Sequence, residues 1–370
     1  MIERVLKGDL LTSRAQTLIN TVNTVGVMGK GIALQFRRRF PEMYADYRDR
    51  CAAGAVRLGE PYLYQRPDPP WIINFPTKDH WRSLARLDAI DQGLEFLVAN
   101  LERWRVESLA VPPLGTGNGR LEWTEVGPLI YRRLKDVPIP VELYAPFNVP
   151  DDHATPAFLE ARADAARHGS PIPVGWLAIA EIVDRIERAQ HAWPVGRTRF
   201  QKLVYFATAA GVPTGAAFQE DAYGPFAPSL NRELTSLVNL DVLVEERSGR
   251  LLRLVPGPAL DDLRGHHQEQ LARFRPAIDR VSDLLIRLDG PGTELTGSIH
   301  YAAMRLASEL GRAPTEREVL AKVQAWKRRR QPQFAPADIG DAIRDLAMLG
   351  WIEVASSGDL PAANGAATVA

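Results

Sequence analysis

The residues best suited to chemistry follow a short apolar run near the start of the chain. The run LINTVN ends in Asn20 and Asn23, and the glycine-rich stretch GVMGKG then precedes a helix predicted at Ile32–Arg39. Glycines let the backbone approach a ligand closely, and free N–H groups at a helix N-terminus favour negative charge. This segment therefore predicts a loop that binds a phosphate group.

A second glycine-rich stretch, GTGNG, comes shortly after another strand-like run, Ser108–Val111. Asn-Gly is a common turn pair, so one such stretch alone is compatible with an ordinary tight turn. Two glycine loops after two strand ends suit a diphosphate with a ribose on its far side. The second loop consists of Gly115, Thr116, Gly117, Asn118 and Gly119.

Lys78 is the strongest candidate for covalent or acid–base chemistry. It lies in FPTKDHWR, just after the predicted strand Trp71–Phe75. A lysine that is partly desolvated can act as a nucleophile and form an imine with an opened sugar. It can also stay charged as a general acid or electrostatic stabiliser. A surface lysine or a contact to DNA phosphate remains the alternative.

The composition is that of an ordinary globular protein. The chain has 370 residues, 45% hydrophobic and 24% charged, with a formal net charge of zero. Cys51 is the only cysteine, so an internal disulfide and a cysteine-based zinc site are excluded. We expect no metal site, because the seven histidines have no ligand-like spacing. No signal peptide or membrane span is expected, which favours a cytoplasmic location.

The pattern of elements divides the chain into parts. Residues 1–150 alternate strands and helices, which predicts an α/β domain with a mixed sheet flanked by helices. Residues 151–173 are expected to form a linker, and 174–355 a mainly helical, winged-helix-like domain with a hairpin near Leu243–Val255. Residues 356–370 are expected to be a disordered tail. The first part carries 20 Lys and Arg against 17 Asp and Glu, and the remainder 25 against 28.

In the helical part, long helices are expected at Leu260–Leu288 and Glu294–Glu309, and a short extended piece at Trp351–Val354 after the last helix. The run AWKRRRQPQ, residues 325–333, is its most basic patch. A winged helix with such a patch permits DNA binding, although so short a run is more often a helix end.

The motifs in residues 1–147 resemble a macrodomain when they are taken together in order. They are Gly8-Asp9-Leu10, LINTVN, GVMGKGIALQF, TKDHW and VPPLGTGNGRLEW. Within that superfamily the chain is most similar to terminal-ADP-ribose hydrolases and to the DarG-type antitoxins of DarT–DarG systems. The resemblance implies ADP-ribose as the ligand and needs no metal or other cofactor.

The resemblance also implies roles for particular residues. Asp9 would accept from the adenine amino group, Phe147 would stack on adenine, and Asn20 and Asn23 would contact the distal ribose. Asp9 could instead cap a helical turn, Phe147 could be a core residue, and one asparagine could cap the glycine loop. Lys78 is the expected catalytic residue. The expected substrate-binding set is Asp9, Leu10, Asn20, Asn23, Gly29, Lys30, Gly31, Ile32, Ala33, Thr77, Gly115, Thr116, Gly117, Asn118, Gly119 and Phe147.

One position departs from the related hydrolases. They carry an acid soon after the second glycine loop, where this chain has Gly119. Either Lys78 works without that acid, or Asp79, His80 or Glu122 substitutes for it. Near the site, the basic residues Arg37–Arg39 and Arg82 and the aromatic Trp81 could contact a DNA strand, but such residues are more often simply solvated.

The second part carries a different pair of motifs. RFQKLVYFA, residues 199–207, and DAYGPF, residues 221–226, resemble the signatures of Panacea-type, SocA-like antitoxin domains. The resemblance implies that this part binds a toxin directly. Its mildly acidic balance would suit mimicry of the toxin's DNA substrate.

The expected function is that of an antitoxin. The first domain would hydrolyse the N-glycosidic bond of ADP-ribosyl-thymidine in single-stranded DNA, and the second would bind a DarT-type ADP-ribosyltransferase toxin. The alternatives are a hydrolase of ADP-ribosylated protein acids and a non-catalytic ADP-ribose reader fused to a regulator.

Overall fold

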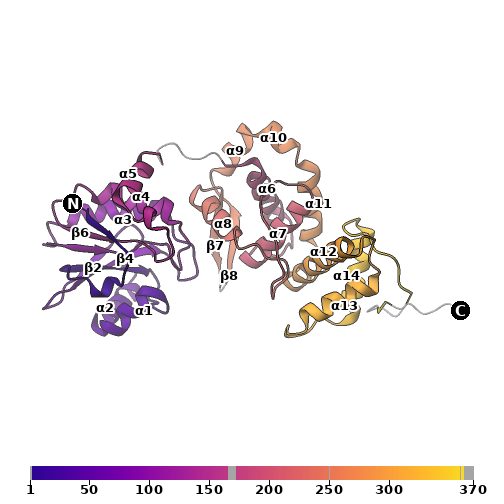
Figure 1. Cartoon of the computed structure of the whole chain (residues 1–370), viewed down its shortest axis with the longest axis horizontal. Coiled ribbons are helices and arrows are strands. Elements are labelled where there is room, and N and C mark those ends of the chain that lie inside the picture. The colour runs from indigo at the N-terminus through magenta and orange to yellow at the C-terminus, as the bar shows by residue number, and fades with distance from the viewer. Residues whose placement is uncertain (1, 166–171, 250, 359, 362–370) are drawn as a thin grey trace. The chain divides into compact units, whose positions relative to one another are not determined.

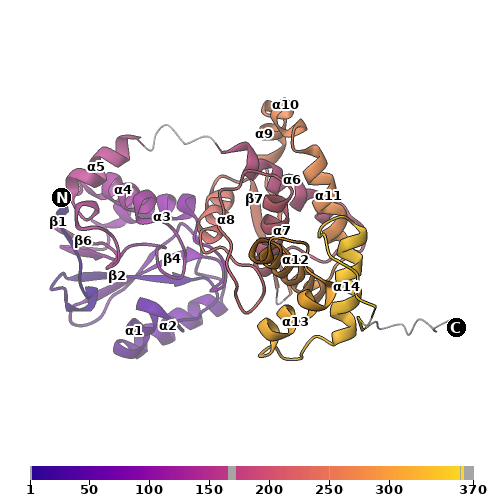
Figure 2. The ribbon, with the colours of Figure 1, turned by 45° about the vertical axis from the view of Figure 1, so that its right-hand side comes forward.

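The computed structural model describes residues 2–165, 172–249, 251–358 and 360–361 of the chain. These residues form two units, which are described separately. The first consists of Met1–Pro171 with Asn231–Leu240, and the second of Ile172–Leu230 with Asp241–Ala370. Figures 1 and 2 show the elements of each unit from two directions.

A six-stranded mixed sheet forms the centre of the first unit. Five strands are parallel, and the edge strand β3 pairs antiparallel with β4. In spatial order the strands are β1 (Ile2–Leu6), β6 (Val141–Tyr144), β5 (Leu109–Val111), β2 (Thr17–Asn23), β4 (Trp71–Lys78) and β3 (Tyr62–Tyr64). This confirms the α/β arrangement expected from the alternating pattern.

Helices cover both faces of the sheet, as Figure 1 shows. Below it in that view lie α1 (Gly31–Arg39) and α2 (Pro41–Ala52); above it lie α3 (Leu87–Asn100), α4 (Trp123–Leu134) and α5 (Pro156–Ala165). Neighbouring residues of β2 and β4 point to opposite faces and enter different cores. Leu18 and Ile72 join the core under α1 and α2, whereas Ile19 and Ile73 join the core under α3 and α4. A sheet buried on both faces explains why these strands are almost continuously apolar.

Part of the expected linker belongs to the first unit. Leu159 of α5 is fully buried in the core beneath α3 and α4. The indole of Trp123 also donates a hydrogen bond to the carbonyl of His153, at 3.0 Å. Residues 151–165 are therefore packed against the sheet's helices.

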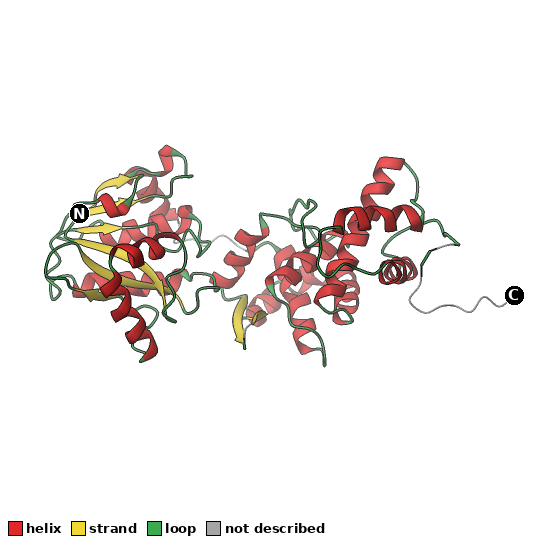
Figure 3. Cartoon of the chain, turned by 90° about the horizontal axis from the view of Figure 1, so that it is seen from below, coloured by secondary structure: helices red, strands yellow, loops and turns green. Residues whose placement is uncertain are grey.

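The second unit is mainly helical, as expected, and Figure 3 shows helices and the hairpin by colour. The hairpin is confirmed: β7 (Leu243–Ser248) pairs antiparallel with β8 (Leu251–Pro256). It follows α8 (Leu230–Asn239) in the chain. The helices of this unit are α6 (Val174–Arg188), α7 (Arg197–Ala209), α9 (Leu260–His266), α10 (Gln268–Ala272), α11 (Arg275–Ile286), α12 (Gly290–Leu310), α13 (Glu316–Lys327) and α14 (Pro336–Met348).

Two expectations for the second unit are wrong. The single helix expected over residues 260–288 is broken into α9, α10 and α11, because the backbone leaves helical geometry at His267 and Pro276 starts a new helix. The extended piece expected at Trp351–Val354 is not a strand; the nearest pairing is an isolated bridge between Thr315 and Ala355. Within the described residues, no helix is both long and apolar enough to cross a bilayer.

Candidate functional site

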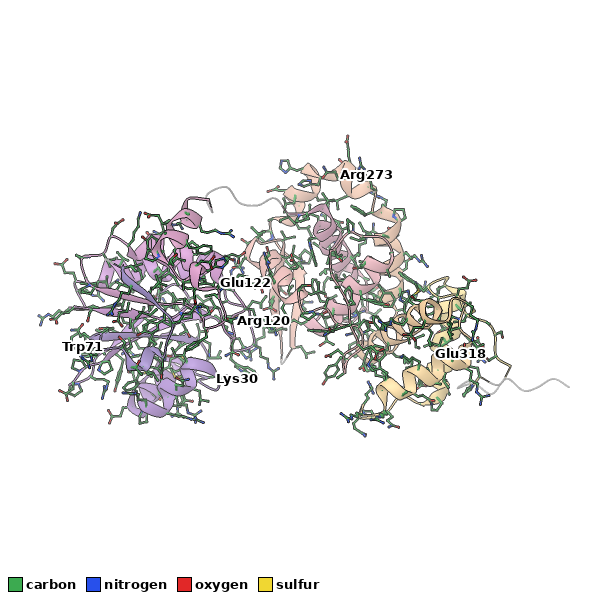
Figure 4. The ribbon with its side chains drawn as sticks, viewed as in Figure 1. Lys30, Trp71, Arg120, Glu122, Arg273 and Glu318 are labelled. Carbon is green, nitrogen blue, oxygen red and sulfur yellow. The ribbon has the colours of Figure 1, made fainter. Side chains whose placement is uncertain are left out.

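A cavity of about 650 Å³ lies at the C-terminal ends of the parallel strands of the first unit. Its walls come from the segments that follow β1, β2, β4, β5 and β6. Figure 4 shows Lys30 and Arg120, from two of these segments, on the side of the unit opposite Trp71, the first residue of β4. Ligands of open α/β sheets bind at this edge, where the strands end.

All the predicted site residues except Asn20 line this cavity. The sequence patterns did not single out most of the other wall residues, because proline and small apolar residues at strand ends carry no chemical signal of their own. The additional lining residues are Gly8, Thr21, Val22, Val27, Gln35, Trp81, Pro112, Pro113, Tyr144, Ala145 and Pro146.

The first glycine loop ends in a helix N-terminus with free donors. Helix α1 starts at Gly31, whose φ of 58° is in the left-handed region that favours glycine. The first helical hydrogen bond runs from the N–H of Leu34 to the carbonyl of Lys30. The N–H groups of Gly31, Ile32 and Ala33 have no acceptor within the helix and can donate to a ligand. This end of the cavity is therefore suited to an anion.

A backbone hydrogen bond closes the second glycine loop, and the tip of the loop lines the cavity. The N–H of Leu121 donates to the carbonyl of Gly115, at 3.1 Å. Among the described residues, the N–H groups of Gly117, Asn118 and Gly119 have no acceptor. The two loops also approach each other, since a Cβ on Gly31 would lie 3.2 Å from the side-chain nitrogen of Asn118.

Gly119 occupies a position where no side chain fits. A Cβ there would lie 2.2 Å from the carbonyl oxygen of Gly115 and 2.7 Å from the Cβ of Ala85. The carbonyl of Gly119 accepts a hydrogen bond from the N–H of Ala85, at 3.0 Å, which holds the loop in place. The acid that related hydrolases carry at this point is therefore excluded by the backbone packing of this chain.

None of the three proposed substitutes for that acid lines the cavity. The carboxylate of Asp79 accepts from the N–H of His80, at 2.7 Å, and Nδ1 of His80 accepts from the N–H of Arg82. Glu122 lies at the start of α4, outside the cavity wall. Among the described residues, Asp9 is the one carboxylate in the wall.

Lys78 is the last residue of β4, and its side chain reaches the second glycine loop. Its Nζ donates to the carbonyl oxygen of Asn118, at 2.6 Å, and lies 3.5 Å from the carbonyl oxygen of Trp81. Lys78 is paired with Asn23 in the strand register. The amine thus sits between the end of β2, the second glycine loop and the loop that follows β4.

The two asparagines have different environments. Asn20 is fully buried toward α1 and α2, where its amide nitrogen bonds Asn74 at 2.8 Å. Asn23 lines the cavity, yet its amide also holds the first glycine loop: its nitrogen donates to the carbonyl of Val27 and its oxygen accepts from the N–H of Val25. The register shifts between Val22 and Asn23, where β4 has one extra residue, Thr77, so that Asn23 pairs with Lys78.

A buried tyrosine completes the support of Asn23. The hydroxyl of Tyr47, on α2, donates to the backbone carbonyl of Asn23 at 2.6 Å. Burial raises the pKa of Tyr47, so the hydroxyl stays protonated and remains a donor.

Asp9 and Phe147 lie in the wall on the β1 and β6 side. One carboxylate oxygen of Asp9 accepts from the N–H of Leu11, at 3.0 Å, and caps the short 3-10 helix Leu10–Thr12. The capping alternative is therefore confirmed, and the second oxygen is not used by the cap. Phe147 is 74% exposed, so it is not a core residue and can stack on a planar group.

Within the described residues, no group of three or more His, Cys, Asp or Glu side chains could hold a metal ion. The wall of the cavity includes glycine-loop N–H groups, the lysines Lys30 and Lys78, and the exposed aromatics Trp81 and Phe147. This combination suits a ligand that carries phosphate, sugar and a planar ring.

Comparison with known proteins agrees with this description. The Macro domain model matches residues 19–130. The chain is 36% identical to the DNA ADP-ribosyl glycohydrolase of Thermus aquaticus, over 81% of this chain and 82% of that protein. It is 33% identical to that of Mycobacterium tuberculosis, over 92% and 98%. Among solved structures, the macrodomain of Mycobacterium tuberculosis DarG is 45% identical, with a TM-score of 0.38, and covers 40% of this chain and 98% of that one. The chain belongs to the family of DarG-type DNA ADP-ribosyl glycohydrolases.

Proposed function

We propose that the first unit removes ADP-ribose from thymidine in single-stranded DNA, and that the chain is the antitoxin of a DarT–DarG pair. The observation that carries the proposal is the position of the Lys78 amine, 2.6 Å from the carbonyl of Asn118 in the second glycine loop. A primary amine beside a diphosphate site is placed to act on the ribose that follows the diphosphate.

The geometry supports one orientation of ADP-ribose. The free N–H groups of the α1 N-terminus and of residues 117–119 would bind the diphosphate. Asp9 and Phe147, in the wall beyond β1 and β6, would bind the adenine, and Asn23 and Lys78 would lie by the distal ribose. The base that is bonded to C1″ of this ribose would then project past Lys78.

Lys78 serves the reaction in one of two ways. As a nucleophile, its neutral amine attacks C1″, the bond from C1″ to thymine N3 breaks, and N3 takes a proton from water. The glycosylamine formed in this way opens to an imine when the bond from C1″ to the ring oxygen breaks and that oxygen takes up a proton from the lysine nitrogen; water then hydrolyses the imine to ADP-ribose and the free lysine. As an ammonium, Lys78 instead stabilises charge while water attacks C1″. Both routes proceed without a carboxylic acid at position 119, because a thymine N3 anion is a better leaving group than an alkoxide.

The test is release of ADP-ribose from single-stranded DNA that carries ADP-ribosylated thymidine. We expect release by the wild type and a loss of at least about a hundredfold in rate for Lys78→Ala, with ADP-ribose binding retained. Equal release by both proteins would keep the function and reject the role of Lys78. No release by the wild type, with release from ADP-ribosylated protein, would favour the protein hydrolase; no release from either would favour the reader.

We also propose that the second unit binds the DarT-type toxin, as its similarity to Panacea-type, SocA-like domains implies. The two motifs of that resemblance contact each other. Gln201 of α7 exchanges two hydrogen bonds with the backbone of Ala227, and Nζ of Lys202 donates to the carbonyl of Pro225, at 3.1 Å. The loop over residues 221–227 is therefore fixed by buried donors of α7.

Helix α13 fixes the same loop from the other side. The indole of Trp326 donates to the carbonyl of Asp221, and Nζ of Lys327 donates to the carbonyl of Ala222, at 2.8 Å. At the tip, Tyr223 is 64% exposed and Gly224 has a φ of 95°. A rigid loop that presents an aromatic side chain has the properties of a protein-binding anchor, because little entropy is lost on binding.

This part of the proposal is tested by the affinity of the full chain for its cognate toxin. Tyr223→Ala is expected to weaken binding by about tenfold or more, a common cost at an aromatic anchor. Met348→Ala is the matched control, because Met348 is also an exposed apolar residue of this unit, at 79% exposure. Equal affinities for wild type and Tyr223→Ala would exclude the loop as the toxin contact. Binding that is insensitive to salt would argue against DNA mimicry.

A winged-helix role in DNA binding has weaker support. The order of helix α8 and hairpin β7–β8 fits that fold, but the basic run over residues 327–330 is partly neutralised. Lys327 and Arg330 both contact the buried carboxylate of Glu294, at 2.9 and 3.3 Å. Only the middle of the run, Arg328 and Arg329, remains available for phosphate.

A further inference from the structure

Trp81 is a large aromatic residue of the cavity wall that the proposed roles leave unexplained. It follows β4 by three residues, lines the cavity and is 42% exposed. Exposing so large an apolar side chain is unfavourable unless it contacts something in the functional state. Its backbone carbonyl lies 3.5 Å from Nζ of Lys78, so it borders the candidate catalytic amine.

The loop that carries Trp81 is held in place from two sides. The hydroxyl of Thr24 donates to the carbonyl of Asp79, at 2.6 Å. At the other end, the N–H of Ala85 donates to the carbonyl of Gly119, at 3.0 Å. The guanidinium of Arg82 lies 4.4 Å from the centroid of the Trp81 ring, which further orders the indole. Trp81 is therefore presented at a fixed position relative to both glycine loops.

The cavity has a second exposed aromatic, Phe147, on the far side of the glycine loops. Trp81 follows β4 and Phe147 follows β6, and β2 and β5 lie between these two strands. Three strand spacings separate the two strand ends by about 14 Å. The N-terminus of α1 follows β2, and the loop over residues 115–119 follows β5, so both phosphate-binding loops belong to the strands in between.

Two stacking surfaces on either side of a diphosphate site fit a ligand with a planar ring at each end. We infer that Trp81 stacks on the nucleobase that is bonded to the distal ribose, while Phe147 stacks on the adenine. This inference rests on the proposed function and specifies its substrate class. Trp81 is then a positioning residue that favours base-linked ADP-ribose over ADP-ribose linked to a protein carboxylate, which has no ring to stack.

The test compares two ligands that differ only in the nucleoside bonded to the distal ribose. The full chain with Lys78→Ala is used, so that the ligand stays intact, and Kd is measured for ADP-ribose and for the nucleoside ADP-ribosyl-thymidine. Trp81→Ala is expected to leave the Kd of ADP-ribose within about twofold and to raise that of ADP-ribosyl-thymidine about tenfold, as for the loss of one stacked base. Trp81→Phe is expected to restore most of the affinity.

Phe147→Ala is the matched variant at the other aromatic, and it is expected to weaken both ligands alike. If Trp81→Ala also weakens both ligands equally, or weakens neither, the inference is wrong. The two proposals can fail separately. Base-dependent binding through Trp81 by a wild-type chain that releases no ADP-ribose would overturn the hydrolase alone. Hydrolysis of modified DNA that is unaffected by Trp81→Ala would overturn the stacking alone.

Discussion

The Nζ of Lys78 donates a hydrogen bond of 2.6 Å to the backbone carbonyl of Asn118, so the candidate catalytic amine is bonded to the loop that would bind the diphosphate. Both the ammonium and the neutral amine have an N–H group that can make this bond. A neutral amine can keep this bond while its lone pair attacks a sugar carbon. A ligand in the second glycine loop would lie directly beside the amine, which connects binding of the diphosphate with the position of the amine.

The first prediction concerns Gly119. Gly119→Asp introduces the acid of the related hydrolases, but its Cβ would collide with the carbonyl of Gly115, 2.2 Å away. We expect the variant to lose ADP-ribose affinity and thermal stability rather than to gain activity, as measured by calorimetry and melting temperature. Gly117→Ala is the control for stability, because nothing lies within 4 Å of a Cβ at that position. A Gly119→Asp protein with wild-type stability and faster hydrolysis would contradict this account.

The sequence was sufficient to predict the α/β arrangement and the residues around the cavity, because glycine loops, strand ends and Lys78 have characteristic local patterns. It could not say which of Asn20 and Asn23 faces the ligand. The two side chains, three positions apart on one strand, point to opposite faces, and Asn20 is buried against Asn74 by helices that are distant in the sequence. The exclusion of an acid at Gly119 likewise depends on Ala85, which is 34 positions away in the chain and adjacent in space.

The break of the expected helix over residues 260–288 has a similar cause. Its apolar spacing is helical throughout, so periodicity alone predicts one element. Backbone geometry at His267, with φ of −113° and ψ of 20°, and Pro276 in the first turn of α11 decide the actual boundaries. The ends of these helices therefore follow from the local backbone geometry and the position of proline more than from the apolar spacing.

The second prediction separates the two asparagines. Asn23→Ala removes the bonds to Val25 and Val27 that shape the first glycine loop. We expect ADP-ribose affinity to fall about tenfold, in line with the loss of one or two hydrogen bonds. Asn20→Leu, in the buried strand interior, should lower stability and leave affinity unchanged. Titration calorimetry measures the ADP-ribose affinity of both variants. A larger loss of affinity for Asn20→Leu than for Asn23→Ala would mean that Asn20, and not Asn23, supports ligand binding.

The third prediction is a pH dependence that comes from His300. Burial, together with the nearby positive charge of Arg280, lowers the pKa of His300 to about 4, and its Nδ1 lies 2.7 Å from the hydroxyl of Tyr205. The unfolded chain, with a histidine pKa of about 6.5, binds the proton first as the pH falls. The neutral histidine therefore contributes stability that is full above about pH 6.5 and is lost as the pH falls towards 4, in total on the order of 3 kcal/mol.

His300→Phe should make the free energy of unfolding depend less on pH in this range. Urea unfolding at about pH 7 and about pH 5 measures the slope, and the wild type is expected to lose more stability between them than the variant. His266→Gln is the control, because His266 lies exposed on α9 and should leave the slope as it is. The same slope in His300→Phe and wild type would mean that folding does not change the pKa of His300.

The fourth prediction uses two glutamates of α12 that differ in burial. Glu294 is 9% exposed, and its carboxylate lies 2.9 Å from Nζ of Lys327 and 3.3 Å from Nε of Arg330. Glu309 pairs with Arg305 on the surface, at 3.2 Å. Glu294→Gln leaves the buried ammonium of Lys327 without its counter-charge, and breaking a buried pair in this way costs about 3 to 5 kcal/mol. Breaking an exposed pair with Glu309→Gln should cost about 0.5 kcal/mol or less.

The Glu294→Gln variant also tests why the pKa of Lys202 is low. Burial and the neighbouring charge of Lys327 lower it to about 8, while Glu294 opposes the shift. Without the carboxylate, Lys202 should lose its proton at a lower pH, and the loop over residues 221–227, which Lys202 and Lys327 hold, should open more often. Hydrogen exchange of the Gly224 and Ala227 amides would report that opening. Equal melting temperatures for Glu294→Gln and Glu309→Gln would mean that water reaches the buried pair and that the loop does not depend on it.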